Sequence, residues 1–97
     1  MLTHIVIWKY KPEASEEQRR EHVARLRGLK GLVPEVRNLA VGADVLKLPR
    51  SYHTGLVATF DDRAGLEAYD RHPEHQAVVQ IGRAISEHVA SVDFEDD

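Results

Sequence analysis

One short segment of this chain carries the side chains needed for acid–base chemistry: residues 69–75 read Tyr-Asp-Arg-His-Pro-Glu-His. Histidine is the side chain whose unperturbed pKa lies nearest neutrality. Because proline is tolerated in the first turn of a helix, Pro73 predicts that one helix ends near Asp70 and that another begins at Pro73. His75 would then lie in a first helical turn, where the helix dipole disfavours the imidazolium. A neutral imidazole at that position is a candidate general base.

A purely structural role is the alternative for the same segment. His72 would cap the second helix and His75 would lie on the surface, because a short motif is only a hypothesis until its structural context is known. Tyr69 would then be a core aromatic whose hydroxyl reaches the rim.

Other catalytic chemistries lack their sequence motifs. His4, His22 and His75 come from three predicted elements without H-E-x-x-H spacing, so we expect no metal site. The sequence contains no G-x-S-x-G nucleophile elbow and no glycine-rich phosphate loop. We therefore expect no cofactor.

Length and composition indicate a single small domain spanning residues 1–97. A chain with 42% hydrophobic residues forms a modest core, and its remaining apolar surface favours a two-fold homodimer. The absence of cysteine excludes disulfides and thiolate metal sites. A net charge of −3 with interspersed signs argues against nucleic-acid binding. No apolar run approaches the ~20 residues that span a bilayer, and no secretory signal is visible, so we expect a cytoplasmic protein with no membrane partner.

Hydrophobic periodicity and breaker residues divide the chain into strands and helices. The expected elements are a strand over Leu2–Lys11, a helix from Ser15 to about Lys30, an extended run over Val36–Leu48, a strand over Tyr52–Phe60, a short helix to Tyr69, a helix from Pro73 to about Glu87, a strand over His88–Phe94 and an acidic tail over Glu95–Asp97. This order is typical of the α+β ferredoxin-like β-α-β-β-α-β fold, a four-stranded antiparallel sheet with both helices on one face. Two uncovered sheet faces packed together would make an alpha-beta barrel.

The first predicted helix has start and stop signals. Ser15 and Gln18 form a capping box, and Gly31 fits a C′ position. Its apolar stripe, with His22 at the margin, is formed by Val23, Leu26, Leu29 and Val33.

The first predicted strand alternates between two faces. Ile5 and Ile7 lie on the face that we expect to be buried between subunits. The opposite face, toward the helices, carries Leu2, His4, Val6, Trp8 and Tyr10.

The chain resembles the stress-responsive A/B barrel family, also called dimeric alpha-beta barrel (Dabb) proteins, along nearly its whole length. The residues that carry the resemblance are the Thr3–Lys11 strand, the Gly31–Pro34 turn, the Val41–Asp44 bend, Tyr69 with His72–His75, and Val92–Phe94. The family includes stress-induced proteins without assigned chemistry and a plant polyketide cyclase, so membership does not fix function.

The segment from Tyr69 to His75 resembles the plant olivetolic acid cyclase branch of this family. That resemblance implies a cofactor-free aldol cyclisation of a linear polyketide in a pocket between helices and sheet. His75 falls at the position of the base, Tyr69 at that of a tyrosine assisting at the oxygen, and His4 at a pocket histidine.

The chain departs from the cyclase pattern on its first helix, where aromatic residues are replaced by His22, Val23 and Leu26. Substrate identity is therefore not carried over. Thr54 matches a further pocket position, and His53, one residue earlier, should point to the opposite face and is left out of the site.

These patterns together predict a small-molecule pocket, mostly apolar with a few polar groups. The expected catalytic residues are His75, Tyr69 and His4, and the expected ligand-binding residues are Val6, Trp8, His22, Val23, Leu26, Leu56, Val78 and Gly82. Three functions are consistent with such a pocket: a binding or stress-protective module without turnover, a cofactor-free cyclase, isomerase or lyase, and a cofactor-free monooxygenase-like barrel.

Overall fold

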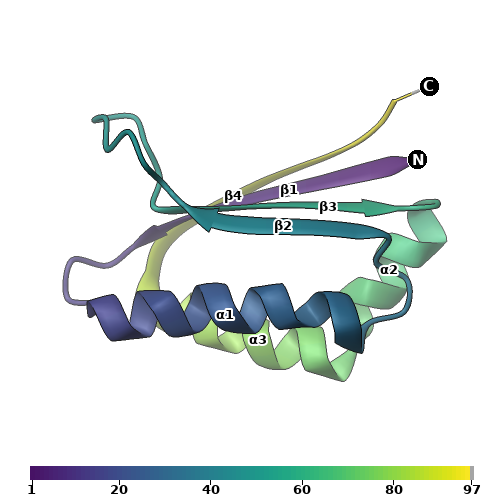
Figure 1. Ribbon diagram of the computed structural model, residues 1–97, viewed down its shortest axis with the longest axis horizontal. Helices are drawn as coiled ribbons and strands as arrows, with labels where there is room; N and C mark the ends of the chain where they lie inside the picture. The colour runs from purple at the N-terminus through teal and green to yellow at the C-terminus, as the bar shows by residue number, and fades with distance from the viewer. Residues whose placement is uncertain (97) are drawn as a thin grey trace.

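The computed structural model describes residues 1–96 and consists of one sheet with helices on one side (Figure 1). The strands are β1 (Leu2–Tyr10), β2 (Asn38–Ala43), β3 (Thr54–Phe60) and β4 (Ser86–Glu95), and the helices are α1 (Glu16–Leu32), α2 (Arg63–Arg71) and α3 (Pro73–Ile85). Asp97, the last residue of the predicted acidic tail, lies outside the described residues. No helix within residues 1–96 is long and apolar enough to cross a membrane.

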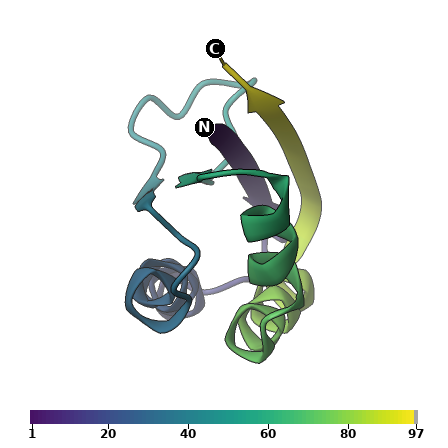
Figure 2. The same cartoon turned by 90° about the vertical axis from the view of Figure 1, so that its right-hand side faces the viewer.

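The four strands form an antiparallel sheet in the order β2-β3-β1-β4, which confirms the predicted ferredoxin-like arrangement. Figure 2 shows the sheet as a curved layer above the helices, with α1 to one side and α2 with α3 to the other. In the centre of the sheet, Val6 pairs with Leu56 on β3 and with Ser91 on β4. These three residues therefore share one face.

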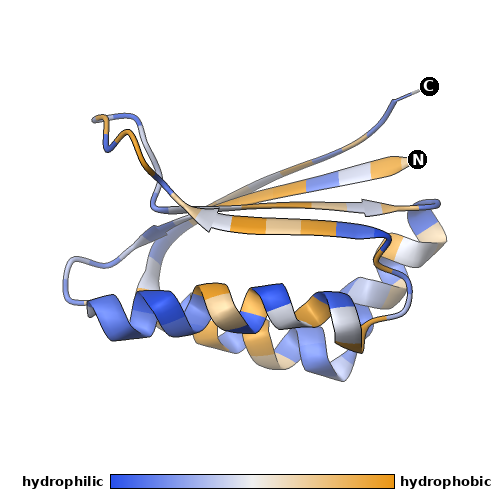
Figure 3. Cartoon of the chain, in the orientation of Figure 1, coloured by the Kyte–Doolittle hydropathy of each residue, from blue (hydrophilic) through white to orange (hydrophobic). Residues whose placement is uncertain are grey.

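The sheet face toward the helices forms the hydrophobic core. The alternation predicted for β1 is confirmed, because Ile5 and Ile7 lie on the other face and are only partly covered. Figure 3 shows that the first turns of α1 are hydrophilic and that hydrophobic residues appear further along this helix. The buried residues include Leu2, Val6, Trp8, Tyr10, Leu26, Leu29, Leu56, Ala58, Phe60, Tyr69, Val78 and Ile85.

Helix α1 begins as predicted and ends later than predicted. The Ser15 hydroxyl accepts the Gln18 N–H and the Gln18 side chain accepts the Ser15 N–H, which confirms the capping box. The prediction that Gly31 terminates the helix is wrong, because Val33 is the C-cap, in an extended conformation. Pro34 accounts for this, since proline disfavours a helical backbone at the residue before it.

The buried stripe of α1 is also rotated relative to the prediction. His22 is 1% exposed and lies within the stripe beside Leu26 and Leu29, rather than at its margin. Val23 is only partly buried. The imidazole can be buried because the Tyr10 hydroxyl provides a hydrogen-bond partner, which offsets the loss of water.

Strand β2 ends at Ala43, within the predicted bend over Gly42–Asp44, so the prediction that an extended run continues beyond this bend to Leu48 is wrong. The Asp44 N–H donates to the His53 carbonyl at 2.8 Å, which closes the loop between β2 and β3. The Asp44 carboxylate accepts the Lys47 N–H at 2.7 Å. Aspartate commonly forms such turns by bonding nearby backbone, and this local turn replaces the strand.

The junction between α3 and β4 differs from the prediction of a helix to about Glu87 and a strand from His88. The helix ends at Ile85 and the strand follows directly. The Ile85 carbonyl accepts the Lys11 N–H at 2.8 Å, so bonding to the segment after β1 replaces helical hydrogen bonds at this point. Strand β4 then continues to Glu95, which was predicted to belong to the tail.

The sheet face opposite the helices carries exposed apolar side chains. Val57 on β3 is 44% exposed, and on β4 Val92 is 53% and Phe94 is 44% exposed. Ile5 on β1 pairs with both Val57 and Val92. Apolar side chains from three neighbouring strands therefore adjoin one another on this face.

Candidate functional site

A cavity of about 360 Å³ lies between the inner face of the sheet and helices α1 and α3. It brings together His4 from β1, Tyr69 from α2 and His75 from α3. The other lining residues are Val6, Trp8, His22, Leu26, Leu56, Asp70, Val78, Val79, Arg83, Val89 and Ser91. We call this the histidine cavity.

Two predicted lining residues lie outside the histidine cavity. Val23 borders a second cavity, on the other side of α1. Gly82 lies directly against the His22 ring, since a Cβ atom built there would be 2.8 Å from Nε2.

Sequence reasoning missed some lining residues of the histidine cavity. Val79 and Arg83 follow His75 at steps of four residues along α3, and this helical spacing is a signal that could have found them. Val89 and Ser91 come from β4 through its pairing with β1, which no local pattern reveals.

The helix break has the geometry that the sequence predicts. Pro73 occupies the first turn of α3 and His72 is the N-cap, with its Nδ1 accepting the Glu74 N–H at 3.1 Å. The capping role considered for His72 is therefore correct. The His75 side chain is only 12% exposed, so His75 is not a surface residue.

The protonation of His75 follows from its contact with Asp70. Its Nδ1 lies 3.1 Å from the Asp70 carbonyl oxygen. A carbonyl only accepts, so Nδ1 carries the proton and Nε2 is the free lone pair of the neutral ring. Burial lowers the pKa of His75, an effect that the hydrogen bond to the Asp70 backbone opposes. The imidazole is thus a neutral acceptor at pH 7.

Tyr69 is a hydrogen-bond donor beside this base. Its ring centroid lies 4.2 Å from that of His75 and 6.1 Å from that of His4. The residue is 1% exposed, and burial raises the pKa of its phenol, with the Asp70 carboxylate adding to the effect. The hydroxyl therefore stays protonated at any physiological pH.

His4 is oriented by a carboxylate from the neighbouring strand. Its Nδ1 contacts the Asp93 carboxylate, and the two residues pair directly across β1 and β4. Because an ionised carboxylate only accepts, Nδ1 of His4 carries a proton. Asp93 thus fixes the orientation and the tautomer of the His4 ring, as a carboxylate hydrogen-bonded to a functional histidine commonly does.

His22 lies at the back of the histidine cavity. Its ring contacts Trp8 edge to face, with centroids 5.0 Å apart, and its Nδ1 lies 2.7 Å from the Tyr10 hydroxyl. Burial lowers the pKa of His22 from 6.5 to about 4. The imidazole is a neutral part of the cavity wall.

His53 does not reach the histidine cavity, although the reason given for excluding it is wrong. It precedes β3 and therefore does not obey strand alternation. Its ring stacks on Tyr10 with an interplanar angle of 1°, and its Nδ1 accepts the Tyr10 N–H at 2.9 Å. Within residues 1–96 no group of three or more His, Asp or Glu side chains is placed to hold a metal ion.

The chain matches the family described as the Stress responsive A/B Barrel Domain over residues 2–96. The protein therefore belongs to that family. No curated protein matches it.

Similar solved structures have the same fold. A dimeric ferredoxin-like protein of unknown function from Thermobifida fusca is 28% identical, with a TM-score of 0.88 over 96% of this chain and 88% of that one. Another, from Jannaschia sp. CCS1, is 29% identical, with a TM-score of 0.82 over 98% of both chains. A hydroxynitrile lyase from Passiflora edulis is 18% identical, with a TM-score of 0.88 over 99% of this chain and 93% of that one, and it shares the fold alone.

Proposed function

We propose that the protein binds a small, largely apolar molecule with a polar group such as a carbonyl in the histidine cavity. The observation that supports this is the convergence of His4, Tyr69 and His75 on a cavity that is otherwise mostly apolar. Ligand sites typically combine an apolar lining with a few polar groups that set orientation. The volume of about 360 Å³ suits a molecule of modest size.

We propose that the functional form is a homodimer in which the uncovered sheet faces of two copies pack together. The solved relatives from Thermobifida fusca and Jannaschia are dimeric by description. The exposed side chains of Val57, Val92 and Phe94 would be buried away from water in such an interface. Burial of apolar area favours association by about 25 cal/mol per Å², before the entropy cost of association is subtracted.

A cofactor-free acid–base reaction is the second candidate function, and the free Nε2 of a neutral His75 beside the Tyr69 phenol favours it. His75 would take a proton from the carbon next to a substrate carbonyl as the C–H bond breaks. The electron pair would move to the carbonyl oxygen, and the Tyr69 hydroxyl would donate a hydrogen bond to the enolate that forms. His75 would then return the proton to the product.

Two similarities are consistent with this chemistry. The Tyr69 to His75 segment resembles the olivetolic acid cyclase branch of the family. The Passiflora edulis relative is a lyase by name. The substrate is not specified by either one.

Thermal shift with a matched pair of probes tests ligand binding. Acetophenone has a carbonyl and ethylbenzene does not, so acetophenone should raise the Tm more. A ligand at about a hundred times its Kd adds ~2.7 kcal/mol of stability. Val79→Trp should fill the cavity and abolish the shift, whereas Ala77→Trp, at an exposed position on the same helix, should retain it. Equal shifts with both probes, or a full shift in Val79→Trp, would contradict the proposal.

Deuterium exchange at the methyl group of acetophenone, followed by NMR in D₂O, tests proton abstraction. His75→Gln should slow protein-catalysed exchange by about a hundred- to ten-thousand-fold, the range for loss of a general base. His88→Gln, an exposed histidine on β4, is the control and should not change the rate. Exchange that is equally fast in His75→Gln would remove His75 as the base.

A further inference from the structure

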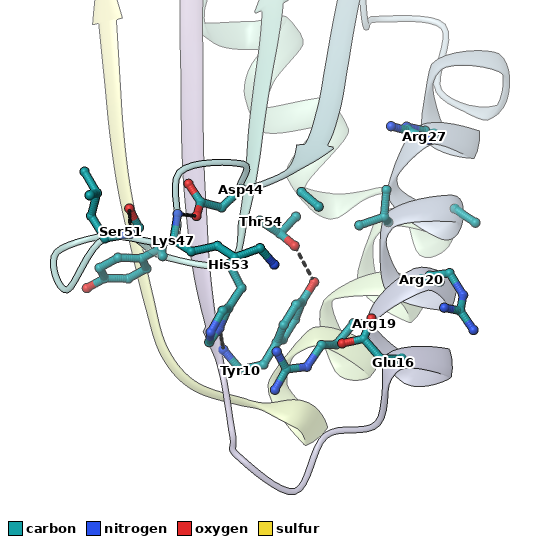
Figure 4. Close-up of a pocket in the computed structure, with 15 residues that line it drawn as sticks. Tyr10, Glu16, Arg19, Arg20, Arg27, Asp44, Lys47, Ser51, His53 and Thr54 are labelled. Carbon is teal, nitrogen blue, oxygen red and sulfur yellow. Dashed lines mark hydrogen bonds between the residues drawn. The ribbon is translucent and has the colours of Figure 1, made fainter.

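A second and larger cavity, of about 700 Å³, lies between the first turns of α1 and the loop that joins β2 to β3 (Figure 4). Its lining residues are Tyr10, Glu16, Arg19, Arg20, Val23, Ala24, Arg27, Ala43, Asp44, Lys47, Leu48, Ser51, Tyr52, His53 and Thr54. We call it the arginine cavity. It shares no lining residue with the histidine cavity.

The arginine cavity is positively charged in a chain whose net charge is −3. Its four cationic residues outnumber its two acidic ones, Glu16 and Asp44. The cations are Arg19, Arg20, Arg27 and Lys47. Within residues 1–96, the ion pairs of the protein involve none of them. No carboxylate therefore pairs directly with these four cations, and the two acidic residues of the lining offset only part of their charge.

Backbone carbonyls hold two of the guanidinium groups in place. Arg19 donates from Nε to the Ala14 carbonyl at 3.1 Å and from Nη2 to the Lys11 carbonyl at 3.2 Å. Arg27 donates from Nε and Nη2 to the Val41 carbonyl at 3.0 and 2.8 Å. A guanidinium has five N–H donors, so each arginine keeps N–H groups on Nη1 for a ligand. These contacts restrict the arginines without cancelling their charge.

The loop opposite α1 presents a lysine to the same space. Lys47 is the only non-glycine residue within residues 1–96 with a positive φ, at 54°. Its backbone N–H is held by the Asp44 carboxylate, and Ser51 and Leu48 exchange further hydrogen bonds in the same loop. Figure 4 shows the Lys47 side chain extending from the loop toward α1. Unusual backbone conformations of this kind concentrate at ligand-binding sites.

The remaining wall of the arginine cavity supplies one further hydrogen-bond donor, from His53, and an apolar surface that can hold the uncharged part of a ligand. His53 accepts the Tyr10 N–H through Nδ1, so its proton lies on Nε2 as a further donor. Burial lowers the pKa of His53, and the charges of Arg19 and Lys9 lower it further. Val23, Leu48 and Tyr52 supply apolar and aromatic surface.

We propose that the arginine cavity binds a small organic anion, with Lys47 and Arg19 at its carboxylate or phosphate group and Arg27 adding positive charge further along α1. Charge-assisted hydrogen bonds from Arg and Lys are the usual means by which proteins recognise such groups. This site is separate from the histidine cavity, so its occupancy does not depend on the function proposed above.

Calorimetric titration with three aromatic probes tests the proposal. Benzoate carries a carboxylate, phenyl phosphate carries a phosphate, and benzamide is a neutral analogue of benzoate. We expect one or both anions to bind and benzamide not to bind. The anion that binds more tightly identifies the preferred group. Equal binding of benzamide, or no binding of either anion at millimolar concentration, would overturn the proposal.

A charge-matched pair of variants tests the location. Lys47→Met should weaken anion binding by about tenfold or more, the effect of losing one charge-assisted hydrogen bond. Lys30→Met removes the same charge from an exposed position in the last turn of α1, and binding should be retained. An equal loss in both variants would mean that only overall charge matters, and the site would be rejected.

Chemical-shift mapping of the unmodified protein gives an answer that does not depend on how the variants fold. Benzoate should shift backbone amide resonances in residues 44–53 and in the first half of α1. Shifts confined to residues that line the histidine cavity would overturn the proposal.

Discussion

The hydroxyl of Tyr10 lies 2.7 Å from Nδ1 of His22, and this hydrogen bond joins the walls of the two cavities. The same hydroxyl lies 2.8 Å from the Thr54 hydroxyl. Because a hydroxyl both donates and accepts, the buried imidazole has a partner while it is uncharged. The core therefore accommodates His22 as a neutral imidazole, and protonation of this buried ring would destabilise the folded state.

The first prediction is that stability falls in acid because of His22. Its pKa is about 4 in the folded protein and 6.5 when unfolded. Between these values the unfolded state binds more protons, so stability is fully present above pH 6.5 and is lost as the pH falls toward 4. The full difference corresponds to about 3 kcal/mol. Urea denaturation at fixed protein concentration, repeated across this pH range, measures it.

A pair of histidine variants isolates the contribution of His22. His22→Gln should flatten the dependence of unfolding free energy on pH, whereas His88→Gln, on an exposed part of β4, should leave it unchanged. The lowered pKa values of His53 and His75 have the same sign and should leave a residual slope. An unchanged slope in His22→Gln would show that His22 is not the responsible group.

The second prediction concerns Gly82, where an added methyl group would meet the His22 ring. A Cβ atom there would lie 2.8 Å from His22 Nε2 and 3.3 Å from Trp8 Nε1. The ring cannot move away easily, because it is buried and bonded to Tyr10. Alanine improves helix propensity by about 1 kcal/mol, but overpacking costs about 1–3 kcal/mol. We expect Gly82→Ala to give no stabilisation and to destabilise the protein by up to about 2 kcal/mol in chemical denaturation.

Gly28 provides the matched control for Gly82. It lies in α1 with no heavy atom within 4 Å of a Cβ built there. Gly28→Ala should therefore show the propensity gain alone and stabilise the protein by about 0.5–1 kcal/mol. If both substitutions stabilised the protein, close contact between Gly82 and His22 would be refuted.

The element order could be predicted because local signals in the sequence agree with the fold. The alternation along β1, the capping box at Ser15 and the helix start at Pro73 each depend on residues close together in the chain. Errors arose where a distant contact decided the outcome. The β4 boundary depends on Lys11, and the burial of His22 depends on Tyr10.

The candidate site was only partly predictable for the same reason. Tyr69 and His75 flank one helix break, so their proximity follows from the short distance between them in the sequence. Asp93 reaches His4 only through the register of β4 against β1, which no local pattern encodes. The arginine cavity was not predicted from the sequence. The arginines of α1 alone look like an ordinary solvent-exposed helix face, and the cavity is recognised only when the fold places the loop with Lys47 opposite them.

The third prediction concerns the tautomers of His75 and His72. His75 donates from Nδ1 to the Asp70 carbonyl, whereas His72 accepts the Glu74 N–H at Nδ1. Long-range ¹H–¹⁵N NMR spectra should therefore show the Nδ1–H form for His75 and the Nε2–H form for neutral His72. Because burial lowers the pKa of His75, its ring should remain neutral below pH 6.5. An Nε2–H tautomer for His75 would place its lone pair on Nδ1, against the Asp70 carbonyl oxygen, and would rule out Nε2 as the proposed base.

The fourth prediction is that one charge on the uncovered sheet face separates the proposed dimer. Val57 lies next to Ile5 on the apolar surface that these two residues form with Val92, so Val57→Asp would bury an unpaired carboxylate between subunits. Such burial costs several kcal/mol, and about 3 kcal/mol weakens association a hundredfold. Sedimentation should show a dimer for the unmodified protein at micromolar concentration and a folded monomer for this variant. Leu32→Asp, exposed at the end of α1, should remain dimeric. A monomeric unmodified protein, or an intact dimer in Val57→Asp, would exclude this interface.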